Sequence, residues 1–188
     1  MGFPVAGKSL HHLTRKPLTW LSGLKAAAAS NQSGDDRTAG IIAATTIDVS
    51  LERLIRTRFR SLKPSDSDAI FSGTGPLSTF SGKIQIAYAL GLIGPYTKHD
   101  FSTIKDIRNV FAHSTHNYSF RTKQIHDRCL GMHIVKRNNN YTESVEEKFD
   151  PRFAFLSATR VFWFLLQLKG DNKRRVRIKK KVSDDLAF

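Results

Sequence analysis

The sequence predicts an all-α fold, a single-domain helical bundle with a flexible N-terminal arm and a basic C-terminal tail. The length of 188 residues suits one domain with appendages, and such a chain can bury a core without covalent cross-links. Apolar residues recur at helical spacing through most of the chain, and outside residues 133–149 no alternating apolar run of useful length favours a strand. The pair Asp150-Pro151 also marks a clear helix start.

Three parts are expected along the chain. They are an N-terminal arm with a short helix at 18–29 (residues 1–35), the helical domain (36–169) and a basic tail (170–188). The pair His11 and His12 lies in the arm without a second group of ligands. We therefore expect surface histidines there and predict neither a metal site nor a cofactor.

The first long helix is expected at 36–62. Its apolar residues, from Ile47 to Leu62, follow a helical rhythm, and Lys63-Pro64 is expected to end it. A segment rich in Gly, Ser and Pro follows at 71–80, which predicts a loop whose backbone packs closely.

Two further helices are expected before residue 114. One covers 78–93, where the small residues Ala87 and Gly91 favour close helix packing. Asp100 is expected to cap the next helix. That helix carries Arg108 on an otherwise apolar stripe of Phe101, Ile104, Ile107 and Phe111.

The C-terminal half predicts a weaker helix at 122–132 and a strong one from Asp150 to Lys169. Between them, a polar segment favours a surface loop or a small hairpin near Val135 to Val145. The last helix is very apolar, so we expect it either at the centre of the core or at the interface of a homodimer. Because it carries more apolar surface than one neighbour can cover, we predict a homodimer with helical contacts.

The chain is strongly basic, with a formal net charge of +14 and a pI of about 10.2. Such a charge attracts polyanions, above all nucleic acid. The candidate contacts are in the tail: Lys173, Arg174, Arg175, Arg177, Lys179, Lys180 and Lys181. A solvated tail without a partner is the alternative interpretation.

The single cysteine, Cys129, excludes a disulfide framework within the chain and a Cys-rich zinc site. It lies among apolar residues, which favours a buried and unreactive thiol. No apolar run is long enough to cross a membrane. A cytoplasmic protein without a membrane partner is therefore expected.

The segment from Asp106 to His113 is the best candidate for chemistry. On a helix, Asn109 and His113 share a face, and a long arginine at Arg108 reaches its edge. An imidazole can take or give a proton near neutral pH, and a guanidinium can bind the charge on phosphate oxygens. These residue types suit metal-independent cleavage of RNA by its own 2′-hydroxyl.

A structural role explains the same residues. In that interpretation Arg108 pairs with a carboxylate such as Asp48 or Asp106 and ties helices together. The spacing alone favours the structural role but does not exclude the catalytic one.

Several strings of the sequence resemble the mannitol operon repressor family. They are Gly75-Pro76-Leu77-Ser78-Thr79-Phe80-Ser81-Gly82-Lys83-Ile84, Ala87-Tyr88-Ala89-Leu90-Gly91-Leu92-Ile93, Ile107-Arg108-Asn109 and Phe111-Ala112-His113. The resemblance covers about residues 36 to 169 and leaves out the arm and the tail. It implies an all-helical regulator, often a dimer, without a recognised DNA-binding motif, so that repression would need a protein partner.

The spacing of Arg108 and His113 also resembles the Arg-x4-His motif of the HEPN superfamily. That resemblance implies a metal-independent ribonuclease or toxin, with Arg108, Asn109 and His113 in a composite site across a dimer. The favoured function is a non-enzymatic transcriptional regulator that acts through protein contacts. The alternatives are the HEPN-type ribonuclease and a nonspecific nucleic-acid-binding module.

Overall fold

The computed structural model describes residues 35–138 and 150–171. These residues form helices and no strand, so the predicted all-α bundle is confirmed there. The helices are α3 (Asp36–Arg56), α4 (Pro64–Phe71), α5 (Phe80–Ala89), α6 (Pro95–His113), α7 (Lys123–Gly131), α8 (His133–Asn138) and α9 (Pro151–Asp171). The predicted helix at 18–29 lies outside the described residues.

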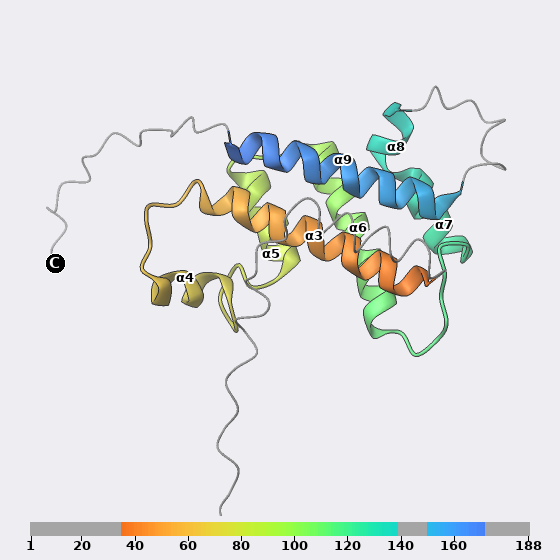
Figure 1. Cartoon of the computed structure of the whole chain (residues 1–188), viewed down its shortest axis with the longest axis horizontal. Coiled ribbons are helices and arrows are strands. Elements are labelled where there is room, and N and C mark those ends of the chain that lie inside the picture. The colour runs from red at the N-terminus through yellow and green to blue at the C-terminus, as the bar shows by residue number, and fades with distance from the viewer. Residues whose placement is uncertain (1–34, 139–149, 172–188) are drawn as a thin grey trace, which may run out of the picture.

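Helices α3 and α9 lie side by side and run in the same direction, with α5 and α6 packed behind them (Figure 1). Two polar contacts join the pair along its length. At the first turns, Arg152 forms an ion pair with Asp36 at 2.7 Å, and farther along Gln167 donates to Ser50 at 3.4 Å. The two chain segments thus keep one register over their whole contact.

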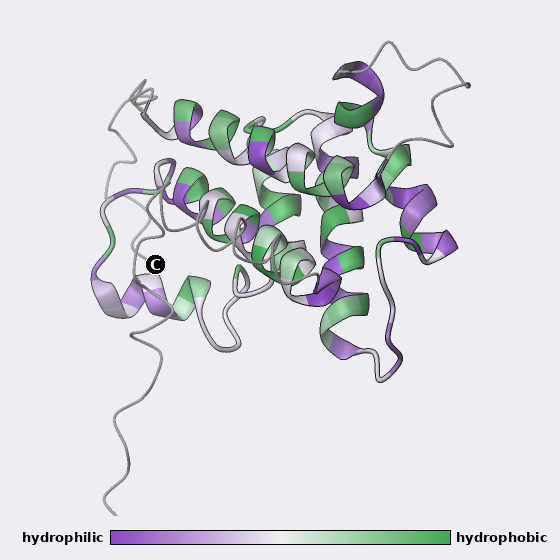
Figure 2. Ribbon diagram, turned by 45° about the vertical axis from the view of Figure 1, so that its right-hand side comes forward, coloured by the Kyte–Doolittle hydropathy of each residue, from purple (hydrophilic) through white to green (hydrophobic). Residues whose placement is uncertain are grey.

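The centre of the core is aromatic. Phe111 meets Phe120 edge to face with ring centroids 5.1 Å apart, and Phe101 meets Phe162 in the same way at 4.9 Å. Gly40 on α3 makes this packing possible, because a Cβ there would lie 2.4 Å from Cδ2 of Phe111. Figure 2 shows hydrophobic residues recurring along α3, α6 and α9, whereas α7 and the loop leading to it are largely hydrophilic.

The first helix is shorter than predicted. It ends at Arg56, and the hydroxyl of the capping residue Thr57 donates to the Leu54 carbonyl at 2.7 Å. Pro64, predicted to end a helix, instead opens α4, where its missing N–H is not needed. The loop after α4 packs closely as expected, since a Cβ at Gly75 would lie 2.4 Å from the Ala69 carbonyl oxygen.

The predicted role of Gly91 is wrong. Ala87 is buried in the core, but Gly91 has a φ of +67° in the turn after α5, and nothing lies within 4 Å of its Cβ position. The turn needs a left-handed residue there, so Gly91 serves backbone conformation rather than helix packing.

The predicted role of Asp100 is also wrong. Helix α6 begins at Pro95, six residues earlier than expected, so Asp100 lies inside the helix with 1% of its surface exposed. Its carboxylate accepts the backbone N–H groups of His133 and Ile134, at 2.8 and 2.9 Å. Asp100 therefore caps α8 instead of its own helix.

This cap explains why the expected loop or hairpin near Val135 to Val145 begins as a helix. Residues His133–Asn138 form α8, with Val135 buried, whereas 139–149 lie outside the described residues. The other two predictions in this half hold. Helix α7 follows Thr122, and the Asp150 carboxylate accepts the Arg152 N–H at 3.1 Å at the start of α9.

Cys129 is fully buried, and burial raises the pKa of its thiol to about 12. The neighbouring charges of Asp150 and Asp36 act in the same direction. The predicted burial of the thiol is therefore confirmed, and its raised pKa disfavours the reactive thiolate. None of the described helices has the length and apolar character that a membrane span needs.

Candidate functional site

The residues of the predicted site lie on the last two turns of α6. The guanidinium of Arg108 donates to the amide oxygen of Asn109 at 3.0 Å, and both side chains are partly buried. His113 is the last residue of the helix and is exposed. Among the described residues, no hydrogen bond joins its imidazole to Arg108 or Asn109, so only two of the three groups come together.

The carboxylate partners expected for Arg108 are arranged differently from the prediction. Asp106 forms ion pairs with Arg128, at 2.9 Å, and with Lys105, at 3.1 Å. Asp48 lies near enough to Arg108 for the guanidinium to favour its ionised form, but its ion-pair partner is Lys83. Arg108 thus borders a charged cluster instead of closing it.

That cluster lies between α3 and α5. The ammonium of Lys83 is 2.8 Å from a carboxylate oxygen of Asp48 and 2.8 Å from one of Glu52. Only 6% of the Lys83 side chain is exposed, against 20% for Asp48 and 23% for Glu52. A cation this deeply buried requires paired carboxylates, and two of them share it.

The two carboxylates respond differently to this environment. Burial raises the pKa of Asp48 above its ordinary value, and the nearby Lys83 offsets the effect only in part. Burial acts on Glu52 in the same sense, but hydrogen bonds from Lys83 and Arg56 prevail and hold its pKa below the ordinary value.

Arg56 extends the cluster to α4. Its guanidinium binds Glu52 through two nitrogens, at 2.9 and 2.7 Å, and donates to the hydroxyl of Ser67. The same group lies 3.9 Å from the ring centroid of Phe71, a distance typical of a cation–π contact. Every group of the cluster therefore has an internal partner, which suits a structural connection better than a catalytic centre.

Partial signals for these residues are present in the sequence. Asp48 was an expected partner of Arg108, whereas Glu52 and Lys83 were not singled out. Asp48 and Glu52 are four residues apart on one helix face, and Lys83 interrupts an apolar face formed by Phe80, Ile84 and Ala87. The sequence pattern typical of such a cluster has two parts: a lysine on an otherwise apolar helix face, and two acidic residues four positions apart on another helix.

The predicted nucleic-acid-binding residues, Lys173, Arg174, Arg175, Arg177, Lys179, Lys180 and Lys181, all lie outside the described residues. His11 and His12 do so as well. In the described part of the chain, one group of side chains has its ligand atoms close enough to share a metal ion: His99, Asp100 and His133.

Comparisons with known proteins add a family and a fold. The family model described as mannitol repressor matches residues 38–165. No curated protein sequence matches the chain. A chain in the X-ray structure of the MtlR-HPr complex from Escherichia coli has a similar fold, with a TM-score of 0.56 and 18% identity. The alignment covers 79% of this chain and 97% of that one.

Replacing Lys83 with Met should lower the free energy of unfolding by about 2–3 kcal/mol at neutral pH, because two carboxylates lose their shared cation. Without Lys83 the folded-state pKa values of both carboxylates rise, so the folded chain holds protons that the unfolded chain has released. The stability of the variant then falls as the pH rises above the ordinary carboxyl pKa, and its defect should shrink as the pH is lowered to about 4, where the unfolded chain also regains its protons. Urea unfolding at about pH 7 and about pH 4 measures it.

Lys123→Met is the matched control, since Lys123 forms a surface ion pair with Asp127 at 3.1 Å and is 84% exposed. It should leave stability unchanged at both pH values. Equal defects in the two variants, or a Lys83 defect that does not vary with pH, would contradict the importance of the buried cluster.

Proposed function

Because the chain belongs to the mannitol repressor family, we propose that it is a non-enzymatic regulatory protein that acts on transcription through a protein partner. The family model spans 38–165, which includes most of α3, all of α4 to α8 and most of α9. The internal pairing of Lys83, Asp48 and Glu52 supports this proposal, because the charged groups that lie near Arg108 in the described part of the chain are bound to one another.

The observation that carries the proposal is the fold similarity over 97% of a chain from the MtlR-HPr complex. That protein is described in a complex with HPr, so HPr is the first partner to test for this chain. The known complex also supports action through protein contact rather than through a DNA-reading motif of the chain itself.

We expect the full chain to bind purified Escherichia coli HPr with one-to-one stoichiometry and a Kd on the order of micromolar. Isothermal titration calorimetry measures the affinity. A net charge of +14 attracts acidic proteins nonspecifically. The control is therefore an unrelated acidic protein of the same size as HPr. Equal binding of that control, or no heat with HPr, would exclude HPr as the partner.

A homodimer through α9 belongs to the same proposal. Three large apolar side chains are about half exposed in the C-terminal half of this helix: Phe164 at 52%, Leu165 at 45% and Leu168 at 50%. Phe164 and Leu168 are four residues apart, so they lie on one face. Lys169 donates to the Leu92 carbonyl at 2.9 Å, which brings this end of α9 beside the turn where Leu90 is 47% exposed. A second copy that covers this apolar area is the occupant we propose.

The double variant Phe164→Glu with Leu168→Glu should weaken dimerisation at least about tenfold, because it places like charges where apolar groups meet. Sedimentation equilibrium measures the association constant. Gln85→Glu adds an exposed charge on α5 and should leave the association unchanged. A wild-type monomer at micromolar concentration, or equal effects of the two variants, would contradict this interface.

A HEPN-type ribonuclease and a nucleic-acid-binding module are the alternative functions. The hydrogen-bonded pair of Arg108 and Asn109 supports the first. In a dimer, the exposed His113 of a second copy would complete a composite site beside this pair. The net charge of +14 supports the second, with the tail as the proposed phosphate contact.

One experiment on RNA separates these functions. We expect no cleavage by the wild-type protein in chelator, since among the described residues no hydrogen bond joins the His113 imidazole to Arg108 or Asn109. Cleavage that is lost in both Arg108→Ala and His113→Ala, with both variants folded, would establish the ribonuclease instead. Salt-sensitive binding without cleavage, abolished by truncation after Asp171, would establish the binding module.

A further inference from the structure

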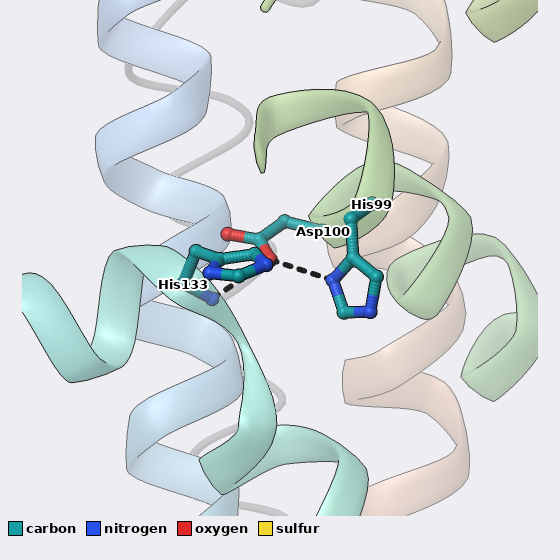
Figure 3. A group of neighbouring side chains, drawn as sticks. All are labelled: His99, Asp100 and His133. Atoms are coloured by element: carbon teal, nitrogen blue, oxygen red, sulfur yellow. Dashed lines mark hydrogen bonds and ion pairs between the residues drawn. The ribbon is translucent and has the colours of Figure 1, made fainter. Parts of the chain in front are cut away.

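A group of three side chains joins α6 to α8. His99 and Asp100 are neighbours on α6, and His133 is the first residue of α8 (Figure 3). Their ligand atoms all lie within 4.8 Å of one another. We propose that His99, Asp100 and His133 form a binding site for a divalent transition metal ion of the zinc type.

The first argument is the charge of Asp100. Its side chain is 1% exposed, and its ion pair in the described part of the chain is with His99, at 3.3 Å, which is charged only when protonated. No lysine or arginine among the described residues pairs with it. A buried carboxylate is normally paired with a cation or coordinates a metal. A bound dication would supply the missing charge.

The second argument is that the carboxylate is already oriented. One oxygen of Asp100 accepts the backbone N–H of His133 at 2.8 Å, and the other accepts that of Ile134 at 2.9 Å. Each carboxylate oxygen has two acceptor positions. Oδ2, which accepts the Ile134 N–H, therefore keeps one for a metal, whereas the second position of Oδ1 faces Nδ1 of His99 at 3.3 Å. Hydrogen bonds of this kind hold ligating carboxylates in place around metal sites.

The third argument is the arrangement of the two imidazoles. Their ring centroids are 4.9 Å apart, and both rings lie beside the same carboxylate (Figure 3). Capping α8 requires Asp100 alone and gives no reason for two histidines at its side. The ring of Tyr96, 4.6 Å from that of His133, packs against the second imidazole and limits its movement.

The donor set determines which ion fits. Two imidazole nitrogens and one carboxylate oxygen suit zinc and related transition metals, whereas magnesium and calcium prefer oxygen ligands. Three protein ligands leave a fourth tetrahedral position for water. The His99 side chain is 59% exposed, so this side is open to solvent, and its ring can turn to bring the ligands together.

The test uses the full-length, untagged chain, stripped with chelator and titrated with Co²⁺ and then Zn²⁺. Tetrahedral Co²⁺ gives a visible absorption band that Zn²⁺ abolishes by displacement. We expect one ion per chain, and a rise in Tm of about 5–10 °C at roughly a hundredfold excess of Zn²⁺ over its Kd. His99→Gln and His133→Phe should each weaken binding at least about tenfold.

Matched variants keep the result interpretable. His133→Phe retains a ring against Tyr96, and His99→Gln changes an exposed side chain, so both should fold with an unchanged helical spectrum. His126→Gln, together with His11→Gln and His12→Gln, removes histidines outside the group and should leave the affinity unchanged. Absence of the Co²⁺ band, or equal loss in these controls, would overturn the proposal. The outcome of this metal-binding test does not depend on whether the chain binds HPr.

Discussion

The fold depends on the need to bury α3 on several sides at once. Its apolar residues pack against α9 beside it and against α5 and α6 behind, and Gly40 lets the ring of Phe111 approach its backbone. Polar contacts then fix where each neighbour lies: Asp36 with Arg152 toward α9, and Asp48 with Lys83 toward α5. Apolar burial supplies most of the free energy, but it has little direction, so these few polar pairs set the register.

This division of roles bears on function. The charged residues that look most like a site, Asp48, Glu52 and Lys83, already satisfy one another inside the molecule. Arg108 lies at the edge of this cluster and is held by Asn109. The features still available for interaction are on the surface, including the exposed apolar residues of α9 and the open imidazole of His99. A regulator that works by contact needs such surfaces more than it needs a cleft.

Local sequence signals predicted the helices well and their ends less well. Periodicity was sufficient for α3 and α9, because each buries one continuous apolar stripe. It failed at Asp100, where the sequence carries a real capping residue but the helix that it caps begins 33 residues later in the chain. The same limit applies to the site. Pairs such as Asp48 with Lys83 or His99 with His133 join distant segments. Spacing in one sequence can mark a residue such as Lys83 as unusual on its own helix, but it does not say which distant residue that side chain meets.

The cap that Asp100 provides also implies an order of folding. Helix α8 has six residues, too few to form alone in water. The acceptors for its first N–H groups come from the interior of α6, so α8 gains its starting point only after that longer helix has formed and packed. In the native protein the same dependence works in reverse: α8 can fray while α6 stays intact, whereas opening of α6 releases α8. Of these two helices, α8 is therefore expected to unfold first and to fold last.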